Sequence, residues 1–255
     1  MTDAELSMRL RANLLDFKAL QARSGPLRMW ERPGVRAFAL TEDPDNVFPQ
    51  QVHYSSSQAL AEVLAPLEAW YRELGVSAWR VLVLPGDTAL EAGLHRAGLR
   101  PEGAVPAMGF SLTHAPPPRL PPGITLERPD DLHTVLELNG VTYGEQHIRY
   151  YTAWRTGPMP SPETHAVVVR EAGRALACGM SFEQGDTAGL YLVASHPEAR
   201  HRGLATLVMQ GLHADARARG RAITVLQATA LGHGFYQHFG YRDLGGWANW
   251  VRRAA

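Results

Sequence analysis

The pattern of apolar and polar residues in the second half of the chain predicts a mixed sheet with helical crossovers. Apolar residues in alternation predict strands, and apolar residues spaced by three and four predict helices. The expected strands are 124–128, 165–170, 174–183, 187–194 and 222–228, with a last one near 247–251. The expected helices are 129–139, 145–155, 203–219 and 231–239. Three antiparallel strands followed by a helical crossover indicate the α/β class.

The later part of the first half has the same order of elements. The expected series is a helix over 58–74, a strand over 79–84, a helix over 88–97 and a strand over 107–112. Gly75 and Gly98 end these helices as Gly220 and Gly240 end their counterparts, and helix C-termini favour glycine because it adopts left-handed backbone angles. This order predicts an internal repeat, although generic alternation of strands and helices gives the same pattern.

A proline-rich stretch divides the chain near its middle. Residues 114–123 contain five prolines, which fix the backbone and remove hydrogen-bond donors. We therefore expect two units, 1–113 and 123–255, joined by an extended linker over 114–122. The alternative is a long proline-rich loop within one domain.

Composition excludes several classes of protein. The chain has 255 residues, 45% of them apolar, and its 25 basic residues balance 25 acidic residues. This balance is typical of a globular protein and argues against a disordered chain or a dedicated nucleic-acid-binding protein. Residues 1–20 lack an uninterrupted apolar core, so we expect no signal peptide, no membrane span and a cytoplasmic location.

Single residues and local charge refine this description. Cys178 is the one cysteine, which excludes an intramolecular disulfide. The histidine spacings match no metal-binding helical pair, so we expect no metal. Lys18 is the one lysine, and we assign it no function. Residues 200–221 hold five arginines and one acid, a local positive excess that suits a polyanion.

The segment around this excess predicts an anion site. A strand runs into Pro197, and after a short loop a helix begins near Gly203. Free N–H groups and the positive end of the dipole make a helix N-terminus attractive to phosphate. Gly203 allows a ligand to approach the backbone, Ala205 leaves the next turn uncrowded, and Arg200 and Arg202 add donors. Neither the dinucleotide fingerprint nor the Walker pattern is present, and a pyrophosphate suits the loop best.

Two motifs carry a family resemblance. The pattern Arg200-x-x-Gly203-x-Ala205 resembles the coenzyme A pyrophosphate loop of the GCN5-related N-acetyltransferase (GNAT) superfamily. The segment Gly234–Tyr241 resembles the late helix of that superfamily, which ends in Phe-Tyr-x-x-x-Gly-Phe/Tyr. The resemblance covers roughly 123–255. It implies an acetyltransferase that uses acetyl-coenzyme A as its acyl donor.

The resemblance also implies a set of coenzyme contacts. They are Leu192, Val193, Ala194, Ser195, Arg200, His201, Arg202, Gly203, Leu204, Ala205, Thr206, Thr229 and Tyr236. Tyr236 matches the tyrosine that in many members protonates the leaving thiolate, and a phenol with a pKa of about 10 suits that task. The alternative for Tyr236 is simple packing on the coenzyme. Thr229 stands where many members have an asparagine, which puts that contact in doubt.

The general base is less well defined. Many members use a glutamate on the strand before the loop, but the inward residues here, Leu190 and Leu192, are apolar. Glu183, His196 and Glu145 are the remaining candidates, and each also fits a solvated surface or turn position. No base is needed if the amine binds in its neutral form.

The early helices of the second half wall the acceptor site in this superfamily. The candidate acceptor contacts are Tyr143, His147, Met180 and Glu183. The aromatic spacing around them also fits an ordinary amphipathic core stripe, to which we assign Tyr150 and Trp154.

The first half lacks the motif residues. Alignment of the helices places Ser55–Leu60 opposite Arg200–Ala205, and Leu94 falls opposite Tyr236. We therefore expect two tandem acetyltransferase-like domains, each a twisted, mostly antiparallel sheet flanked by helices. The first would be a degenerate copy that covers the acceptor cleft, an arrangement similar to that of mycothiol synthases.

The resulting functional hypothesis is an N-acyltransferase. It would move an acetyl group directly from acetyl-coenzyme A to a primary amine, most simply of a small molecule, in a ternary complex. The alternatives are a non-catalytic coenzyme A-binding regulator or scaffold, and a peptide or protein N-acetyltransferase. We expect no nucleic-acid or membrane partner, and a monomer or homodimer.

Overall fold

The computed structural model describes residues 1–253, apart from the side chains of His114 and Tyr150. The first half contains α1 (Asp3–Ser24), β1 (Arg28–Arg32), β2 (Val35–Ala39), β3 (Gln51–Tyr54), α2 (Ser57–Glu73), β4 (Ala78–Val83), α3 (Thr88–Arg96) and β5 (Arg100–Ser111). The second half contains β6 (Ile124–Glu127), α4 (His133–Tyr143), α5 (Glu145–Ile148), β7 (Thr164–Glu171), β8 (Arg174–Gln184), β9 (Thr187–Ser195), α6 (Leu204–Ala218), β10 (Ile223–Gln227), α7 (Ala230–Phe239) and β11 (Arg242–Arg253). Short 3-10 turns η1 (Leu112–His114), η2 (Arg149–Trp154) and η3 (Pro197–Ala199) connect them.

All eleven strands belong to one sheet. Their order is β1-β2-β3-β4-β11-β5-β10-β9-β8-β7-β6, and most neighbouring pairs are antiparallel. The parallel pairs are β3 with β4 and β9 with β10, and a helix connects the strands of each. The predicted mixed α/β class is confirmed. The two halves also repeat one order, β3-α2-β4-α3-β5 and β9-α6-β10-α7-β11.

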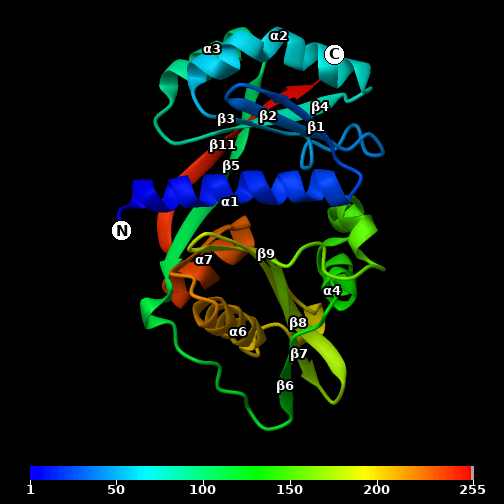
Figure 1. The fold of residues 1–255 in the computed structure, drawn as a ribbon, viewed down its shortest axis with the longest axis vertical. Helices are drawn as coiled ribbons and strands as arrows, with labels where there is room; N and C mark the ends of the chain where they lie inside the picture. The colour runs from blue at the N-terminus through cyan, green and yellow to red at the C-terminus, as the bar shows by residue number, and fades with distance from the viewer. Residues whose placement is uncertain (254–255) are drawn as a thin grey trace.

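The last strand of each half completes the sheet of the other. β5 lies between β10 and β11, with Met108 opposite Leu226. β11 lies between β5 and β4, with Trp250 opposite Val81. Figure 1 shows these two long strands running together from the lower part of the molecule to the upper part. The proline-rich segment that follows β5 therefore separates the halves along the chain but not within the sheet.

Helix α1 lies across the middle of the molecule, between the two halves (Figure 1). Its Leu6 and Leu10 pack in one apolar cluster with Val225 and Trp247. Asn13 donates a hydrogen bond from Nδ2 to the carbonyl oxygen of Phe182 at 3.0 Å. The first helix of the chain is thus attached to the sheet of the second half by burial and by a buried polar contact.

The expected helix over 145–155 is wrong. A left-handed Gly144 (φ 94°) ends α4, α5 has only four residues, and a 3-10 turn follows it. Ile148, Tyr151 and Trp154 are all buried in the core, and their spacing of three places them on one side of a 3-10 turn. Trp154 therefore belongs to the core as predicted, while the side chain of Tyr150 lies outside the described residues.

The exchange of strands predicts that the second half does not fold well alone. A fragment of residues 123–255 lacks β5, which leaves unpaired strand edges on both β10 and β11. We expect this fragment to aggregate or to give a poorly dispersed amide NMR spectrum. A matched fragment of residues 98–255 retains β5 and should give a better dispersed spectrum. A native-like spectrum from the shorter fragment would contradict the structural role of the exchange.

Candidate active site

The centre of the second half contains a gap between two parallel strands. Hydrogen-bonded pairing of β9 with β10 ends at Gly189 and Val225. Beyond that point β10 continues to pair with β5, and β9 continues to pair with β8. Leu192 has a left-handed backbone (φ 54°) where two residues of β9 lie opposite Gly179, which is the geometry of a β-bulge. The strands therefore diverge at a point where the β9 backbone is also distorted.

Side chains of helix α4 fix the bulged part of β9 by donating hydrogen bonds to the carbonyl groups of that strand. The side-chain nitrogen of Asn139 donates to the carbonyl oxygen of Leu192 at 2.8 Å. The hydroxyl of Tyr143 donates to Val193 O at 3.1 Å, and the hydroxyl of Thr142 donates to Ser195 O at 3.3 Å. These three bonds hold the strand away from β10, so the gap is a built feature of the fold.

A cavity of about 210 Å³ occupies the divergence of the two strands. Its second-half walls are Leu190–Val193 of β9, the region from Gln227 to Tyr236, and the side chains of α4 that face β9. Its other wall comes from α1 and the first half, including Phe17, Phe48 and Arg80. The cavity is therefore shared between the two halves of the chain.

Tyr236 projects from α7 into this cavity. Its ring lies against Phe235 and Tyr241, with centroid separations of 5.2 and 5.7 Å. Burial, with Tyr143 nearby, raises the pKa of the Tyr236 hydroxyl well above its ordinary value of 10. The phenol is therefore protonated at neutral pH. The predicted proton donor thus lies beside the diverging strands.

The predicted pyrophosphate loop has the form of an anion site. His201 (φ 62°) and Gly203 (φ 75°) have left-handed backbones, and Gly203 precedes α6 without a side-chain cap. A Cβ added at Gly203 would meet no atom within 4 Å, so the approach to the backbone is open. Arg200 and His201 are exposed here, Ala205 and Thr206 are half-buried in the first turn, and Leu204 packs into the core.

The positive charge of this region is divided between the two ends of α6. Arg202 lies at the loop and forms an ion pair with Glu171 at 2.6 Å. Arg219 and Arg221 lie beyond the opposite end of the helix, where both bind Glu183. The local excess seen in the sequence therefore does not act as a single basic patch, because a helix of fifteen residues separates its parts.

The other predicted coenzyme contacts lie where the two strands diverge. Leu192 and Val193 line the cavity, whereas Ala194 is buried and Ser195 follows it toward the loop. Thr229 also lines the cavity, but its hydroxyl accepts a hydrogen bond from Gly232 N at 3.0 Å and caps α7. The threonine that replaces an asparagine therefore has a structural task of its own.

Two of the four predicted acceptor contacts lie at the cavity. Tyr143 and His147 line it, and their rings are 5.2 Å apart. Met180 is fully buried in the core under α4 and does not line the cavity. Glu183 lies two positions along β8 from Ser181, on the face that α6 covers, and its carboxylate is engaged by arginines. We therefore remove Met180 and Glu183 from the acceptor side.

None of the candidate bases is among the described residues that line the cavity. Glu183 faces away, as stated above. His196 caps a 3-10 turn through Nδ1 and lies 3.2 Å from Arg174. Glu145 forms an ion pair with Arg155 at 3.1 Å. The prediction that a base is dispensable for a neutral amine stays open.

Sequence reasoning missed the first-half residues that line the cavity. Lys18 from α1, Gln51 from β3 and Arg80 from β4 all do so, and each is at most 6% exposed. Asn139 of α4 was missed as well, although it is fully buried at the bulge. No local motif marks these residues, because the exchanged strands bring them together from distant parts of the chain.

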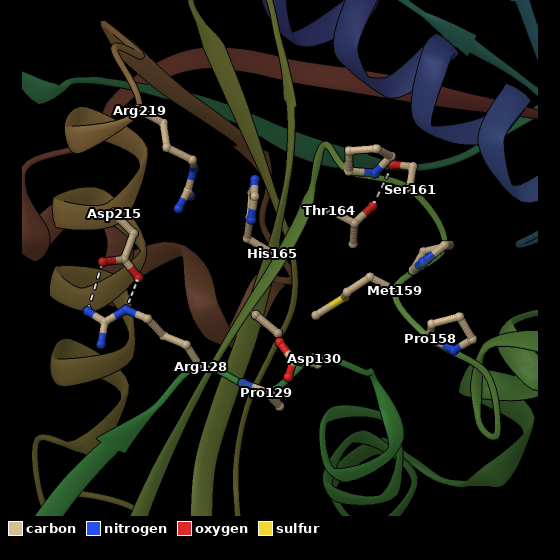
Figure 2. A pocket seen from close by; sticks show the side chains of 13 residues that line it. Arg128, Pro129, Asp130, Pro158, Met159, Ser161, Thr164, His165, Asp215 and Arg219 are labelled. Atoms are coloured by element: carbon tan, nitrogen blue, oxygen red, sulfur yellow. Dashed lines mark hydrogen bonds and ion pairs between the residues drawn. The ribbon is translucent and has the colours of Figure 1, made fainter.

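A larger hollow, of about 600 Å³, lies elsewhere on the second half. Figure 2 shows its side chains, with Arg128 bound to Asp215 by two hydrogen bonds of 2.6 and 2.8 Å. His165 and Arg219 project into the same hollow. Arg128 and Asp215 neutralise each other, Arg219 binds Glu183, and none of the lining residues belongs to the predicted motifs. We therefore place the candidate site in the smaller cavity.

In the first half, helix α2 corresponds to α6, and the carboxylate of Asp87 lies at the N-terminus of α2. Asp87 accepts hydrogen bonds from the hydroxyl of Ser57, in the first turn of α2, at 2.7 and 2.8 Å. It also accepts from the hydroxyl of Tyr54 at 3.1 Å and from the backbone of Leu90 at 3.3 Å. A side-chain anion thus lies at the helix start that the repeat matches to the pyrophosphate loop.

Other kinds of site are not found in the described part of the chain. No group of three or more His, Cys, Asp or Glu residues is placed to hold a metal ion among residues 1–253. Each helix of that range is too short or too polar to cross a bilayer. Cys178 is buried, and burial raises the pKa of its thiol to about 12, so it is not a reactive thiolate.

Three features occur together here: a mixed α/β sheet, two parallel strands that diverge, and an uncapped helix N-terminus beside them. Together they define a class of α/β proteins that transfer acyl groups. Residues 162–243 match the family model of the acetyltransferase (GNAT) domain. The predicted resemblance to the GNAT superfamily is therefore confirmed, and the matched segment lies in the second half of the chain. No curated protein sequence matches the chain.

Solved structures are similar over almost the whole chain. A GCN5-related N-acetyltransferase from Kribbella flavida is 16% identical with a TM-score of 0.71, covering 97% of this chain and 95% of that one. A tandem GNAT protein from the clavulanic acid biosynthesis pathway is 14% identical with a TM-score of 0.65, covering 96% and 95%. At these identities the likeness concerns the fold, and it extends over both halves.

The ion pairs of the buried Glu183 with Arg219 and Arg221, here called the Glu183 cluster, lead to a prediction about stability. Burial favours a raised pKa for this carboxyl, but the bonds to Arg219 and Arg221 outweigh burial and hold the pKa below its ordinary value of 4.5. The cluster therefore stabilises the fold fully above pH 4.5, and this contribution is lost as the pH falls through the folded-state pKa. We expect Glu183→Gln to lower the unfolding free energy at pH 7 by about 3 kcal/mol.

Urea unfolding at pH 7 and at pH 4 measures this effect. Glu198→Gln is the matched control. Glu198 forms an exposed ion pair with Arg174, so this substitution should lower the unfolding free energy by at most about 1 kcal/mol. The difference in unfolding free energy between wild type and Glu183→Gln should be smaller at pH 4 than at pH 7. A gap of equal size at both pH values would show that the carboxylate charge is not the cause.

Proposed function

We propose that the chain is an N-acetyltransferase that moves an acetyl group from acetyl-coenzyme A to a primary amine of a small molecule. The observation that carries this proposal is the single cavity in which the bulged strand β9, the protonated Tyr236 and the first-half wall meet. This arrangement supports direct transfer in one ternary complex, because the thioester end of the donor and the acceptor amine would meet in one cavity.

The residues present fit acetyl-coenzyme A. The open backbone at Gly203 and the N-terminus of α6 suit the pyrophosphate, with Arg200 as an exposed cation beside it. The unpaired β9 edge beyond Gly189 suits the pantetheine arm. When bound, acetyl-coenzyme A supplies an acetyl group activated as a thioester.

The protein side of the mechanism needs an electrophile-polarising group and a proton donor. We assign the first task to the backbone N–H groups of β9 around Leu192, which the bulge turns out of the regular sheet pattern. We assign the second to Tyr236, whose phenol holds its proton because burial raises its pKa, and which lines the cavity. With acetyl-coenzyme A bound, the neutral amine nitrogen would form the new C–N bond as the C–S bond breaks, and Tyr236 would donate its proton to the departing sulfur. The proton lost by the nitrogen would then return to the Tyr236 phenolate.

The wall from the first half favours a small acceptor. α1, β3 and β4 line the cavity opposite β9, so a folded protein surface would have to displace them to reach Tyr236. We accordingly propose that the first half is a degenerate copy that encloses the acceptor. Asp87 supports this proposal. Its carboxylate lies at the start of α2, the position that corresponds to the proposed pyrophosphate site at the start of α6.

A coenzyme A-binding regulator is the second candidate. The observation that favours it is the lack of Asp and Glu among the described residues of the cavity lining, since a bound ammonium would need a base to lose its proton. Release of free thiol with a panel of small amines separates the two candidates, because a regulator would bind the coenzyme without turnover.

Removal of the Tyr236 hydroxyl tests the assigned proton donor. We expect Tyr236→Phe to lower kcat by about 100-fold while the affinity for acetyl-coenzyme A stays within about twofold, since only the acid is lost. Tyr71→Phe is the matched control, because its hydroxyl bonds Phe38 O within the first half. Thiol release and calorimetry give the two values. Unchanged kcat in Tyr236→Phe would remove this residue from the mechanism.

Substitution of Gly203 tests the pyrophosphate loop. A Cβ at φ 75° costs about 1 kcal/mol of stability and projects into the open space where phosphate would approach. We expect Gly203→Ala to weaken coenzyme A binding by at least about tenfold. Gly220→Ala, at the other end of α6 with φ 83° and open space, should cost similar stability and leave binding unchanged. Equal affinities of the two variants would contradict this loop assignment.

A further inference from the structure

Asn139 of α4 carries an unpaired oxygen at the candidate site. Its side chain is fully buried and lines the cavity. Its Nδ2 donates hydrogen bonds to Val135 O and to Leu192 O, both at 2.8 Å. Its Oδ1 has no hydrogen-bond partner among the described residues. Because buried polar atoms are normally paired, an unpaired amide oxygen at a cavity points to a ligand that donates a hydrogen bond.

The two carbonyl groups determine which way the Asn139 amide faces. A carbonyl oxygen accepts hydrogen bonds, so the nitrogen of the amide, and not its oxygen, has to face Val135 O and Leu192 O. The sulfur of Cys178 lies 3.5 Å from the same nitrogen. Val135 and Cys178 belong to the core and are not among the described residues that line the cavity. The nitrogen is therefore turned toward the core, which leaves Oδ1 as the polar atom on the cavity side.

Asn139 also lies directly beside the distorted part of β9. Its nitrogen bonds the carbonyl group of Leu192, the residue at the bulge. Tyr143, one helical turn further along α4, bonds the next carbonyl group of the strand, that of Val193. We assigned the polarisation of the thioester to the N–H groups around Leu192. A ligand nitrogen that donates to Oδ1 would therefore lie close to the thioester.

A neutral oxygen in this position suits a neutral amine. A neutral primary amine has two N–H groups and a lone pair, so one N–H can bind Oδ1 while the lone pair faces the thioester carbon. The nitrogen gains positive charge as the C–N bond forms, which strengthens this hydrogen bond in the transition state. A carboxylate here would instead favour the ammonium, which has no lone pair. Asp and Glu are absent from the described lining.

Two further unpaired atoms in the lining indicate that the rest of the acceptor is polar. Gln51 of β3 is 3% exposed, and its Nε2 donates to Phe48 O at 2.7 Å while its Oε1 has no partner among the described residues. The buried Nε2 of Gln227, at the end of β10, also has no partner in that part of the chain. One atom accepts and the other donates, and a primary amide group offers both complements.

We propose that Asn139 holds the acceptor during transfer, with Oδ1 accepting a hydrogen bond from the reacting amine. The two atoms of one amide then have separate tasks, since Nδ2 supports the bulge and Oδ1 orients the nucleophile. This inference rests on the proposed function and adds to it the residue that binds the reacting group.

The first test uses three amides that differ in one group and bind to the wild-type protein. Glycinamide carries the amine, glycolamide has a hydroxyl in its place, and propionamide has a methyl group. Calorimetry at pH 8 with saturating coenzyme A gives the affinities. We expect glycinamide and glycolamide to bind about tenfold more tightly than propionamide, because a methyl group leaves Oδ1 unpaired. Equal binding of the three, or no binding, would overturn the proposal.

This comparison needs neither a variant nor turnover, so it is separate from the test of the proposed function. Preferred binding of the two hydrogen-bond donors without thiol release from acetyl-coenzyme A and glycinamide would count against the acetyltransferase function and support the site. Thiol release with equal binding of the three amides would support the function and reject the role of Asn139.

The second test removes the oxygen. Asn139→Leu keeps the branched shape of the side chain, and we expect it to lower kcat/KM for glycinamide at least about tenfold while the affinity for acetyl-coenzyme A stays within about twofold. Asn139→Asp also loses the amide nitrogen but keeps an oxygen, so it should be at least about threefold more active than Asn139→Leu. Wild-type kcat/KM in Asn139→Leu would refute the assignment.

Thr142→Val is the matched comparison for the support of β9. It removes the bond from α4 to Ser195 O, and Thr142 is not among the described residues of the cavity lining. The fall in kcat/KM should be at least about fivefold larger in Asn139→Leu than in Thr142→Val. Equal falls in these two variants, or in Asn139→Leu and Asn139→Asp, would show that the oxygen is not the cause. If Asn139→Leu does not fold, the binding of the three amides to the wild-type protein decides.

Discussion

The end of pairing between β9 and β10 is the constraint on which the candidate site depends. Parallel neighbours in a sheet normally stay together, and here each strand leaves the other for a different partner: β10 follows β5, and β9 follows β8. Three side-chain bonds from α4 to the bulged carbonyls keep β9 in its position. The opening is therefore maintained by hydrogen bonds made on either side of it.

The exchanged strands determine what closes this opening. Because β5 and β11 each bridge the two halves, the first half cannot move away from the cavity without breaking a continuous sheet. α1 adds a second connection, since its apolar face and Asn13 are buried against second-half residues. The first half is thus fixed beside the cavity as one of its walls, with its buried polar residues Lys18, Gln51 and Arg80 in the lining.

The sequence was sufficient where the relevant signal is local. The start of α6 after Gly203 and the α7 helix could be predicted because helix starts, glycine positions and short spacings lie within a few neighbouring residues. The strands β1 to β3 and the full lengths of β5 and β11 were not predicted, since prolines such as Pro101 and Pro106 interrupt the strand pattern of β5.

The acceptor side of the site depends on long-range contacts and could not be predicted in the same way. Met180 and Glu183 are close to the site in sequence, but strand alternation and the cover of α6 take them out of it. Lys18 and Arg80 are far from the motifs in sequence; the packing of α1 brings the first to the cavity, and the position of β4 in the continuous sheet brings the second. Contacts between distant elements therefore decide which residues line the cavity.

Asp87 has a consequence for any anion that would bind at the start of α2. A carboxylate attached to the same chain is present at its helix start at an effective concentration that a free phosphate in solution would have to exceed. The first half therefore carries a built-in competitor, held by Ser57 and Tyr54, that also caps α3 and so contributes to the fold. Removal of that side chain would not simply open the start of α2 to an anion, because α3 would lose its N-terminal capping hydrogen bond at the same time. One carboxylate in this way both excludes a ligand from one helix and stabilises another.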